Sequence, residues 1–267
     1  MKDSPVYLKI ENVSKFFTTS NGILPVLKNI NLEIKQGEFV CIVGPSGCGK
    51  TTLLNIIAGL EHPSEGRVLY KGKPLNGTDP DRLVIFQELG LFPWLTVQKN
   101  VEFGLKIKKI LHKEREAIVQ KYLEMVNLVK FKNSFIHELS CGMKQRVALA
   151  RALVMDPEIL LMDEPFTALD AQTRDILHDE LQGIWARTKK TIIFVTHNVR
   201  EAVCLGERVV VLSAAPAAIK ALFPVALERP RNIKNHDLID IVKLVLAELK
   251  SEIEKVLKKE INDKKNI

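Results

Sequence analysis

The sequence predicts an α/β protein with a mainly parallel β-sheet and a helical segment inserted into it. Two apolar runs without polar alternation, 39–43 and 191–196, are typical of strands buried on both faces of a parallel sheet. Between Val97 and Met155, apolar residues instead recur at helical spacing, for example Ile118, Tyr122 and Met125. Strand-like runs resume after that stretch. The helical segment is therefore expected to split an α/β core in two.

Length and composition agree with this class. The 267 residues, 46% hydrophobic and 27% charged, are enough for one large domain or two small ones. They exclude a disordered, collagen-like or disulfide-stapled chain. The four cysteines lack metal-ligand spacing, so we expect reduced thiols in a cytosolic protein. The N-terminus has no apolar run of signal-peptide length.

The elements are expected in the following order. Short β-rich runs bounded by Gly, Pro or Asn predict strands at 6–13, 30–34, 38–43, 67–70, 82–86, 159–162, 191–196 and 209–212. Helices are expected from Lys50 to about Leu60 and from Ser140, a good N-cap, to a point before Pro157. An amphipathic helix is expected from Asp237 onward.

Residues 209–227 are apolar enough to raise the possibility of a membrane span. Pro216 and Pro224 would break a helix there, so strand, turn and strand is the better interpretation. The net charge of +7 alone would suit an anionic lipid surface or nucleic acid. Only Tyr122 and Phe131 lie among the basic residues of 106–132, too few for a base-stacking groove, and a solvated helical face is the simpler interpretation. We expect no nucleic-acid partner.

The sharpest motif is a glycine-rich loop that follows the 38–43 strand and leads into a helix. It fits the pattern G-x-x-x-x-G-K-[ST], and its residues are Gly44, Pro45, Ser46, Gly47, Cys48, Gly49, Lys50, Thr51 and Thr52. Glycines let backbone N–H groups wrap phosphate oxygens, and the helix N-terminus adds partial positive charge. Lys50 would reach the β- and γ-phosphates, and the Thr51 hydroxyl would bind Mg²⁺. We call this loop, residues 44–49, the phosphate loop.

A second strand ends in adjacent carboxylates. Asp163 and Glu164 follow the apolar run 159–162. Behind a phosphate loop, Asp163 would hold Mg²⁺ through its water shell and Glu164 would act as general base for an attacking water. His197 closes the 191–196 strand at the edge where ligands of open α/β sheets bind, which favours a γ-phosphate contact.

In addition to these motifs, Gln87 stands in VIFQELGLFPW, the run 139–146 reads LSCGMKQR, and Ala168-Leu169-Asp170 follows the carboxylate pair. With them, residues 8–231 resemble the ATP-binding subunit of an ABC transporter. The resemblance implies a P-loop NTPase core with an N-terminal antiparallel β subdomain, formed by 1–86 and 155–235. It also implies a helical signature subdomain over 87–154 and a helical tail over 236–267.

The resemblance also implies roles. ATP and Mg²⁺ would be the cofactors, with Phe17 stacking on adenine and Gln87 joining Thr51 and Asp163 near the metal. Two copies would close head to tail as a homodimer, with Ser140 and Gly142 of one copy facing the ATP held by the other. Closure and hydrolysis would drive integral membrane permease subunits and, indirectly, a substrate-binding protein. The chain would then lie peripherally on the cytoplasmic face of the inner membrane.

Within the family, FQELGLFPWLTVQKNVEFGL and Met143 look like the nitrate/sulfonate/taurine importer group. One departure is Cys141, where the family usually has Gly, and this substitution is expected to crowd the closed dimer and slow turnover. Two other readings stay open. A non-transport ABC ATPase acting on the ribosome or nucleic acid would usually carry two cassettes or a long coiled coil, and an ordinary kinase would leave the signature run unexplained.

Overall fold

The computed structural model describes residues 6–20, 22–233 and 236–265, with side chains as far as Val256. The chain forms two compact units. The first contains residues 1–79 and 191–267, and the second contains residues 80–190. The first unit is therefore built from both ends of the chain, and the second is one continuous segment.

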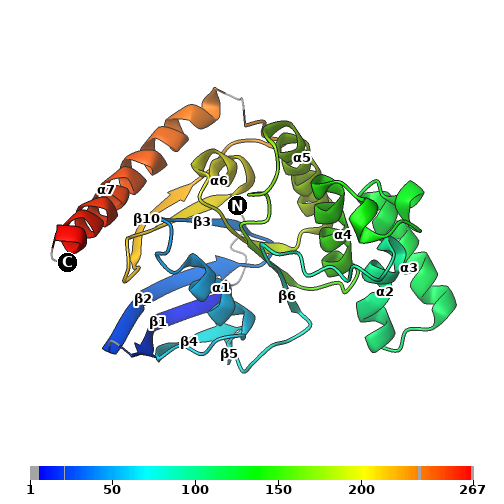
Figure 1. Cartoon of the computed structure of the whole chain (residues 1–267), viewed down its shortest axis with the longest axis horizontal. Helices are drawn as coiled ribbons and strands as arrows, with labels where there is room; N and C mark the ends of the chain where they lie inside the picture. The colour runs from blue at the N-terminus through cyan, green and yellow to red at the C-terminus, as the bar shows by residue number, and fades with distance from the viewer. Residues whose placement is uncertain (1–5, 21, 234–235, 266–267) are drawn as a thin grey trace. The chain divides into compact units, whose positions relative to one another are not determined.

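The parallel sheet of the first unit is centred on β3 (Phe39–Val43), shown in blue in Figure 1. β8 (Thr191–Val195) and β9 (Arg208–Leu212) pair with β3 on its two sides, both in parallel. β10 (Ile219–Pro224) extends this sheet antiparallel to β9. Every residue of β3 and β8 is buried, which explains why both runs are continuously apolar.

A second, antiparallel sheet completes the β structure of the first unit. Its strand order is β2 (Gly22–Lys35), β1 (Val6–Thr19), β4 (Glu65–Tyr70) and β5 (Lys73–Pro74). Along β1 and β2, buried apolar residues alternate with exposed ones in several places, as expected for strands with one face on the core. This sheet is the N-terminal antiparallel subdomain that the family resemblance implies.

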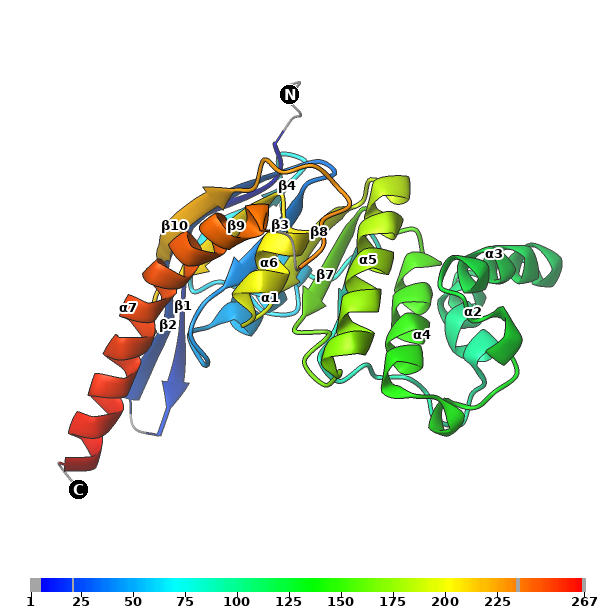
Figure 2. The same cartoon turned by 90° about the horizontal axis from the view of Figure 1, so that it is seen from above.

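In the part of the first unit that the structure describes, three helices cover the sheets. α1 (Lys50–Ala58) follows the phosphate loop and contacts β8, and α6 (Val199–Leu205) contacts β3 and β9. α7 (Asp237–Lys265) lies against α6, β9 and β10, and Figures 1 and 2 show it in orange to red. The apolar residues of α7 that face these elements explain why it packs rather than extends into solvent.

The second unit has two parallel strands, β6 (Arg82–Ile85) and β7 (Ile159–Asp163). Its helices lie side by side in Figure 2. They are α2 (Val97–Ile107), α3 (His112–Met125), α4 (Cys141–Leu153) and α5 (Ala171–Thr188), with short 3₁₀ turns at Val129–Phe131 and Ile136–Glu138. α2 packs against both α3 and α4.

Most expected elements are confirmed, with differences at their ends. The strand expected at 6–13 continues to Thr19, and the strand expected at 30–34 already begins at Gly22. These extensions pair with each other as a long hairpin in which apolar residues such as Ile23 and Leu24 are exposed, so they do not show the burial pattern of a core strand. The helical spacing of Ile118, Tyr122 and Met125 corresponds to α3, which ends at Met125. Asn127 adopts a left-handed backbone with φ 57°, which ends that helix.

The 209–227 segment forms β9 and β10, as the prolines predict. Within the described ranges, no helix has the length and apolar character needed to cross a membrane. α7 begins at Asp237, as expected. Its predicted apolar stripe is only partly buried, because Ile253 is 41% exposed while Val245 and Leu249 are buried.

Asn100 organises the segment before α2. Its side chain is fully buried, and its Oδ1 accepts a hydrogen bond from the Phe92 N–H at 2.8 Å. Its Nδ2 donates to the carbonyl oxygens of Phe92, Leu95 and Thr96 at 3.1, 3.2 and 3.1 Å. One amide therefore satisfies four backbone groups of residues 92–96.

Asn100→Leu is expected to lower the free energy of unfolding by about 2–4 kcal/mol, because the Phe92 N–H and the Leu95 carbonyl, both part-buried, lose this partner at about 1–3 kcal/mol each. Urea unfolding measures the change. Asn133→Leu, at an exposed asparagine of the same unit, is the matched control and should shift the midpoint little. Equal midpoints for the Asn100 variant and the unmodified chain would contradict this assignment.

Candidate nucleotide site

The phosphate loop joins β3 to α1 and closes around the amine of Lys50. Lys50 is 6% exposed, and its Nζ donates to the carbonyl oxygens of Gly44 at 3.1 Å and Pro45 at 3.0 Å. The Cys48 N–H donates to the Pro45 carbonyl at 3.3 Å. The loop therefore holds a cation on its inner side while Ser46 and Gly47 are exposed.

The loop requires glycine at two positions. Gly47 and Gly49 have φ of 71° and 116°, in the left-handed region that side chains disfavour. A Cβ on Gly49 would also lie 2.9 Å from Cγ1 of Val26, so the backbone approaches β2 closely there. No atom lies within 4 Å of the Cβ position of Gly47, which leaves the outer side of the loop open.

The first turn of α1 favours an anion. Gly49 is its N-cap, with no side-chain cap, and the turn contains no acidic residue. Its positive end is therefore not compensated from within the helix. The exposed hydroxyl of Thr51 lies in the same turn, and Thr52 is half-buried. An ammonium group, a hydroxyl and a helix N-terminus form a donor set that fits phosphate oxygens.

His197 lies at the same sheet edge as the phosphate loop. β3 and β8 are parallel, and the Thr196 N–H donates to the Ile42 carbonyl at 3.1 Å, so the residues after both strands emerge together. His197 itself is exposed. Glu201, which is 3% exposed, accepts a hydrogen bond from the Thr196 hydroxyl and anchors the turn that carries the histidine.

Phe17 lies on β1 and is half-buried. The Lys15 Nζ is 4.7 Å from the centre of its ring, a cation–π contact. Glu61 holds this ammonium at 2.8 Å, and the His62 carbonyl accepts from it at 2.9 Å. Lys15 therefore faces the Phe17 ring, and the ring stands in a fixed, positively charged setting.

In the second unit, Gln87 and the carboxylates Asp163 and Glu164 emerge at one edge of the β6–β7 pair. The register pairs Ile85 with Met162, so the residues that follow these strands are neighbours. Asp163 is 7% exposed, whereas Gln87 is exposed. Glu164 adopts a left-handed backbone with φ 44°, and its Oε2 accepts from the Thr167 hydroxyl at 3.3 Å. A strained backbone at a carboxylate is typical of functional positions.

Ser140 and Gly142 lie at the start of α4. Ser140 is the N-cap, and its Oγ accepts from the Met143 N–H at 3.3 Å, which confirms the expected cap. A Cβ on Gly142 would lie 2.6 Å from Cγ2 of Thr173, so this glycine allows α4 to approach α5 closely. Cys141 between them is exposed.

Several residues that support these positions are missing from the sequence-based prediction. Arg174 donates to the Phe166 and Leu169 carbonyls at 3.2 and 2.6 Å and so braces the segment after Glu164. Asp170 caps α5, and its hydrogen bonds with Thr173 lower the pKa of its carboxyl. The spacing of cap and first turn, as in Asp170–Thr173 or Asn198–Glu201, is the signal that would have found them.

The predicted site residues thus fall into two groups. The first unit brings together the phosphate loop, Lys50, Thr51 and His197, and carries Phe17 on β1. The second unit holds Gln87, Asp163 and Glu164 at one strand edge, and Ser140 and Gly142 at the start of α4. Among the residues whose placement is described, no three His, Cys, Asp or Glu side chains cluster as a metal site. Hydroxyl, amide and carboxylate oxygens, such as those of Thr51, Gln87 and Asp163, are the kind of ligand that Mg²⁺ prefers.

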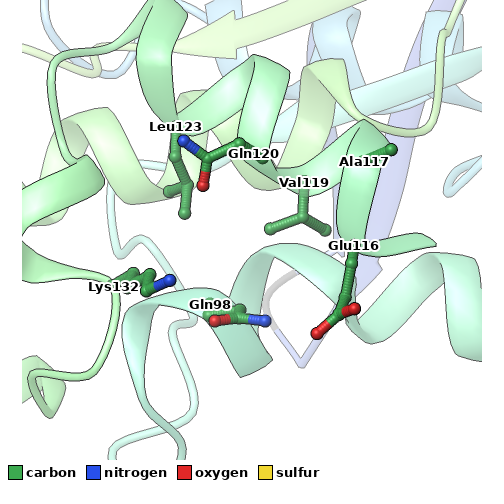
Figure 3. Close-up of a pocket in the computed structure, with 7 residues that line it drawn as sticks. All are labelled: Gln98, Glu116, Ala117, Val119, Gln120, Leu123 and Lys132. Atoms are coloured by element: carbon green, nitrogen blue, oxygen red, sulfur yellow. The ribbon is translucent and has the colours of Figure 1, made fainter. Parts of the chain in front are cut away.

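A separate hollow of about 290 Å³ opens on the second unit. Figure 3 shows its lining residues on and around α3. They are Gln98, Glu116, Ala117, Val119, Gln120, Leu123 and Lys132. None of them belongs to the predicted site, and the hollow has no part in the nucleotide chemistry considered below.

The loop geometry defines the class of protein first. A buried parallel strand, a left-handed glycine loop closed around a lysine, and a helix that begins without its own cap make up a phosphate-binding loop of the nucleoside-triphosphatase kind. The family model for ABC transporters matches residues 27–167, more than half of the chain. The chain belongs to the ABC transporter family.

Individual relatives agree. An uncharacterized ABC transporter ATP-binding protein of Methanocaldococcus jannaschii is 53% identical over 95% of both chains. The nitrate import ATP-binding protein NrtD of Synechocystis is 46% identical, over 85% of this chain and 87% of its own length. The aliphatic sulfonates import ATP-binding protein SsuB of Bacillus cereus is 44% identical, over 90% and 95%.

A solved dimeric structure of a bacterial ABC transporter cassette superimposes with a TM-score of 0.73. It is 36% identical and covers 83% of this chain and all of its own. Fold, family resemblance and ATPase activity are thereby confirmed: this chain is an ATP-binding ATPase of the ABC transporter family.

N-ethylmaleimide is expected to modify the native chain once, at Cys141. The other three thiols are buried, and burial raises the pKa of the Cys41 thiol well above its ordinary value, which lowers its reactive thiolate fraction. Intact-mass and peptide analysis after a short exposure measures the adducts. Cys141→Ser should take none under the same conditions, and the unfolded chain should take four. A rapid adduct on Cys48 would contradict the closed phosphate loop.

Proposed function

We propose that this chain is the ATP-hydrolysing subunit of an importer for a small anion of the nitrate, sulfonate or taurine kind, which passes through a separate membrane permease. The observation that carries the proposal is the phosphate loop closed around Lys50. It occurs in a chain whose relatives include nitrate and aliphatic sulfonate import ATP-binding proteins.

The phosphate loop and the start of α1 bind the triphosphate of ATP. Residues 44–49 supply backbone N–H groups, and Lys50 turns its ammonium from the Gly44 and Pro45 carbonyls toward the β- and γ-phosphates. Phe17 stacks on adenine. Its ring is held beside the Lys15 ammonium, which limits its motion and lowers the cost of ordering it on binding.

Thr51, Gln87 and Asp163 would hold Mg²⁺, partly through water. When bound, Mg²⁺ neutralises charge that develops on the phosphate oxygens. These residues supply a hydroxyl, an amide and a carboxylate oxygen, the hard ligands that Mg²⁺ prefers. Asp163 is buried at a strand end, so its carboxylate is held in place before the nucleotide arrives.

Glu164 accepts the proton of the attacking water, and His197 contacts the γ-phosphate. The left-handed backbone at Glu164 and its hydrogen bond from Thr167 orient the carboxylate. The Thr196–Glu201 contact orients the turn that carries His197. Both groups are thus placed by neighbouring residues, as general acid–base and phosphate-binding roles require.

A second copy completes the site. Ser140 and Gly142 of that copy face the γ-phosphate, where the N–H groups at the start of α4 other than that of Met143, which Ser140 caps, add partial positive charge. The dimeric bacterial cassette supports such an assembly. Head-to-tail closure on ATP and opening after hydrolysis give the two states that move a partner.

The partners are integral membrane permease subunits, with a substrate-binding protein acting through them. The import function in the names of the relatives supports this placement. The chain then lies peripherally at the cytoplasmic face of the membrane. Its anion cargo passes through the permease and does not touch the ATP site.

Lys50→Ala and Glu164→Gln should separate binding from hydrolysis. Loss of the Lys50 ammonium should abolish measurable ATP affinity. Glu164→Gln should keep affinity and lower kcat by about 10²–10⁴-fold, the range for loss of a general base. Nucleotide titration and phosphate release measure the two effects. Lys73→Ala, at an exposed lysine of β5, should change neither. Full ATP affinity in Lys50→Ala would refute the proposed nucleotide site.

Tagged Glu164→Gln protein, purified in mild detergent with ATP, should bring down a polytopic membrane protein in near-equal amount. The reason is that this variant binds ATP without hydrolysing it, and so it stays in the ATP-bound state in which we expect it to remain attached to a permease. Mass spectrometry identifies the partner, and Lys50→Ala is the matched control that should recover less. Recovery of ribosomal proteins or nucleic acid in place of a membrane protein would favour a non-transport ATPase.

A further inference from the structure

A buried carboxylate on α7 lies outside the nucleotide chemistry described above. Glu252 is 2% exposed, one helical turn beyond Leu249, the last of the buried residues that seat α7 on the first unit. A buried acidic side chain is costly unless it is paired and hydrogen-bonded. Its partners therefore indicate what it does.

Glu252 has three partners, and one of them is in the β9–β10 turn. Its Oε2 accepts from the Ala214 N–H at 3.0 Å. Its Oε1 lies 2.9 Å from the Lys220 Nζ and 2.6 Å from the Lys255 Nζ. Burial opposes ionisation, yet the contacts with Lys255, the Ala214 N–H and Lys220 lower its pKa to about 2, so the carboxylate is charged at neutral pH.

The turn that Glu252 holds, residues 213–218, is also joined to β2. The Ala217 N–H donates to the Val26 carbonyl at 2.8 Å, and the Lys28 N–H donates to the Ala217 carbonyl at 2.8 Å. Inside the turn, the Ser213 N–H donates to the Ala218 carbonyl at 2.9 Å. The turn therefore connects α7 to the segment 26–28.

That segment lies directly behind the phosphate loop. A Cβ on Gly49 would lie 2.9 Å from Cγ1 of Val26 and 3.0 Å from Cδ2 of Leu27. At the other end of the loop, a Cβ on Gly44 would lie 3.1 Å from Cβ of Leu212, the residue before the turn. Both ends of the phosphate loop thus rest on residues that flank or pair with the turn held by Glu252.

We propose that Glu252 is a positioning residue for nucleotide binding: its hydrogen bond to the Ala214 N–H fixes the 213–218 turn, and through it the wall of residues 26, 27 and 212 behind the phosphate loop. This inference rests on the proposed nucleotide site. α7 is then a brace: its packing on the first unit strengthens ATP binding, and ATP binding strengthens its packing, because coupling between two sites is reciprocal.

The test measures ATP affinity and turnover of the full chain. Glu252→Ala should raise the Kd for ATP about five- to tenfold, at the lower end of ordinary coupling between sites, and raise KM with little change in kcat. Glu252→Gln keeps an acceptor for the Ala214 N–H and should recover most of the affinity. Glu254→Ala, on an exposed face of the same helix, should bind ATP as the unmodified chain does.

Hydrogen exchange supplies a second readout that does not need turnover. ATP should slow exchange in α7 of the unmodified chain and nearly as much in Glu252→Gln, and it should have a smaller effect on α7 in Glu252→Ala. If Glu252→Ala does not fold, as judged by circular dichroism, ATP-dependent protection of α7 in the unmodified chain decides. Lys220→Ala leaves the Ala214 contact in place and should keep nearly full ATP affinity.

The brace would be overturned if folded Glu252→Ala bound ATP with unchanged affinity. It would also be overturned if ATP did not slow hydrogen exchange in α7 of the unmodified chain. A loss confined to kcat would overturn it as well. Lys50→Ala separates this failure from that of the proposed function. If Lys50→Ala loses ATP and Glu252→Ala does not, only the brace is wrong. If Lys50→Ala binds ATP normally, the nucleotide site itself is wrong.

Discussion

The pairing of β3 with parallel partners on both sides is the constraint on which the nucleotide site depends. All five residues of β3 are buried, and β8 and β9 satisfy its backbone along both edges. The chain leaves each strand at its carboxyl end, and the carboxyl ends of neighbouring parallel strands lie at the same edge of the sheet. The phosphate loop after Val43 and the turn that carries His197 after β8 therefore emerge together.

The helix starts show how the chain divides its polar groups between stability and binding. α2, α4, α5 and α6 each begin at a residue whose own side chain accepts a backbone N–H: Thr96, Ser140, Asp170 and Asn198. α1 begins at Gly49 and has no such cap. A helix start that is not satisfied by its own side chain costs stability and favours an external anion. α3 also lacks a side-chain cap, at Leu111, but it has Glu114 in its first turn, whereas the first turn of α1 has no acidic residue.

Sequence patterns predicted the parts of the fold where one local signal dominates. Continuous apolar runs located β3, β7 and β8, and the glycine pattern located the phosphate loop. α5 was not predicted, because its apolar residues form no clear stripe, although Asp170 is a suitable N-cap residue. The extension of β1 and β2 into a long hairpin depends on pairing between strands, which no single run of residues encodes.

The site was predictable as a set of residues but not as a set of contacts. Motif spacing named Asp163, Glu164 and His197. It said nothing about the left-handed backbone of Glu164 or the Glu201 carboxylate beneath the turn of His197. These features arise from residues brought together by folding. The same is true of Glu252, which stands among apolar positions of α7 and reads as an ordinary surface glutamate until its contacts are known.

The division of the first unit into two chain segments has a consequence for protein synthesis. β3 leaves the ribosome about 150 residues before β8 and β9, a delay of about 8–30 s at about 5–20 residues per second. During that interval a strand that is buried on both faces has no lasting partner, while residues 80–190 form a continuous segment that can fold first. The nascent chain therefore carries an aggregation-prone strand for much of its synthesis, and a chaperone that shields short apolar segments would act on this interval.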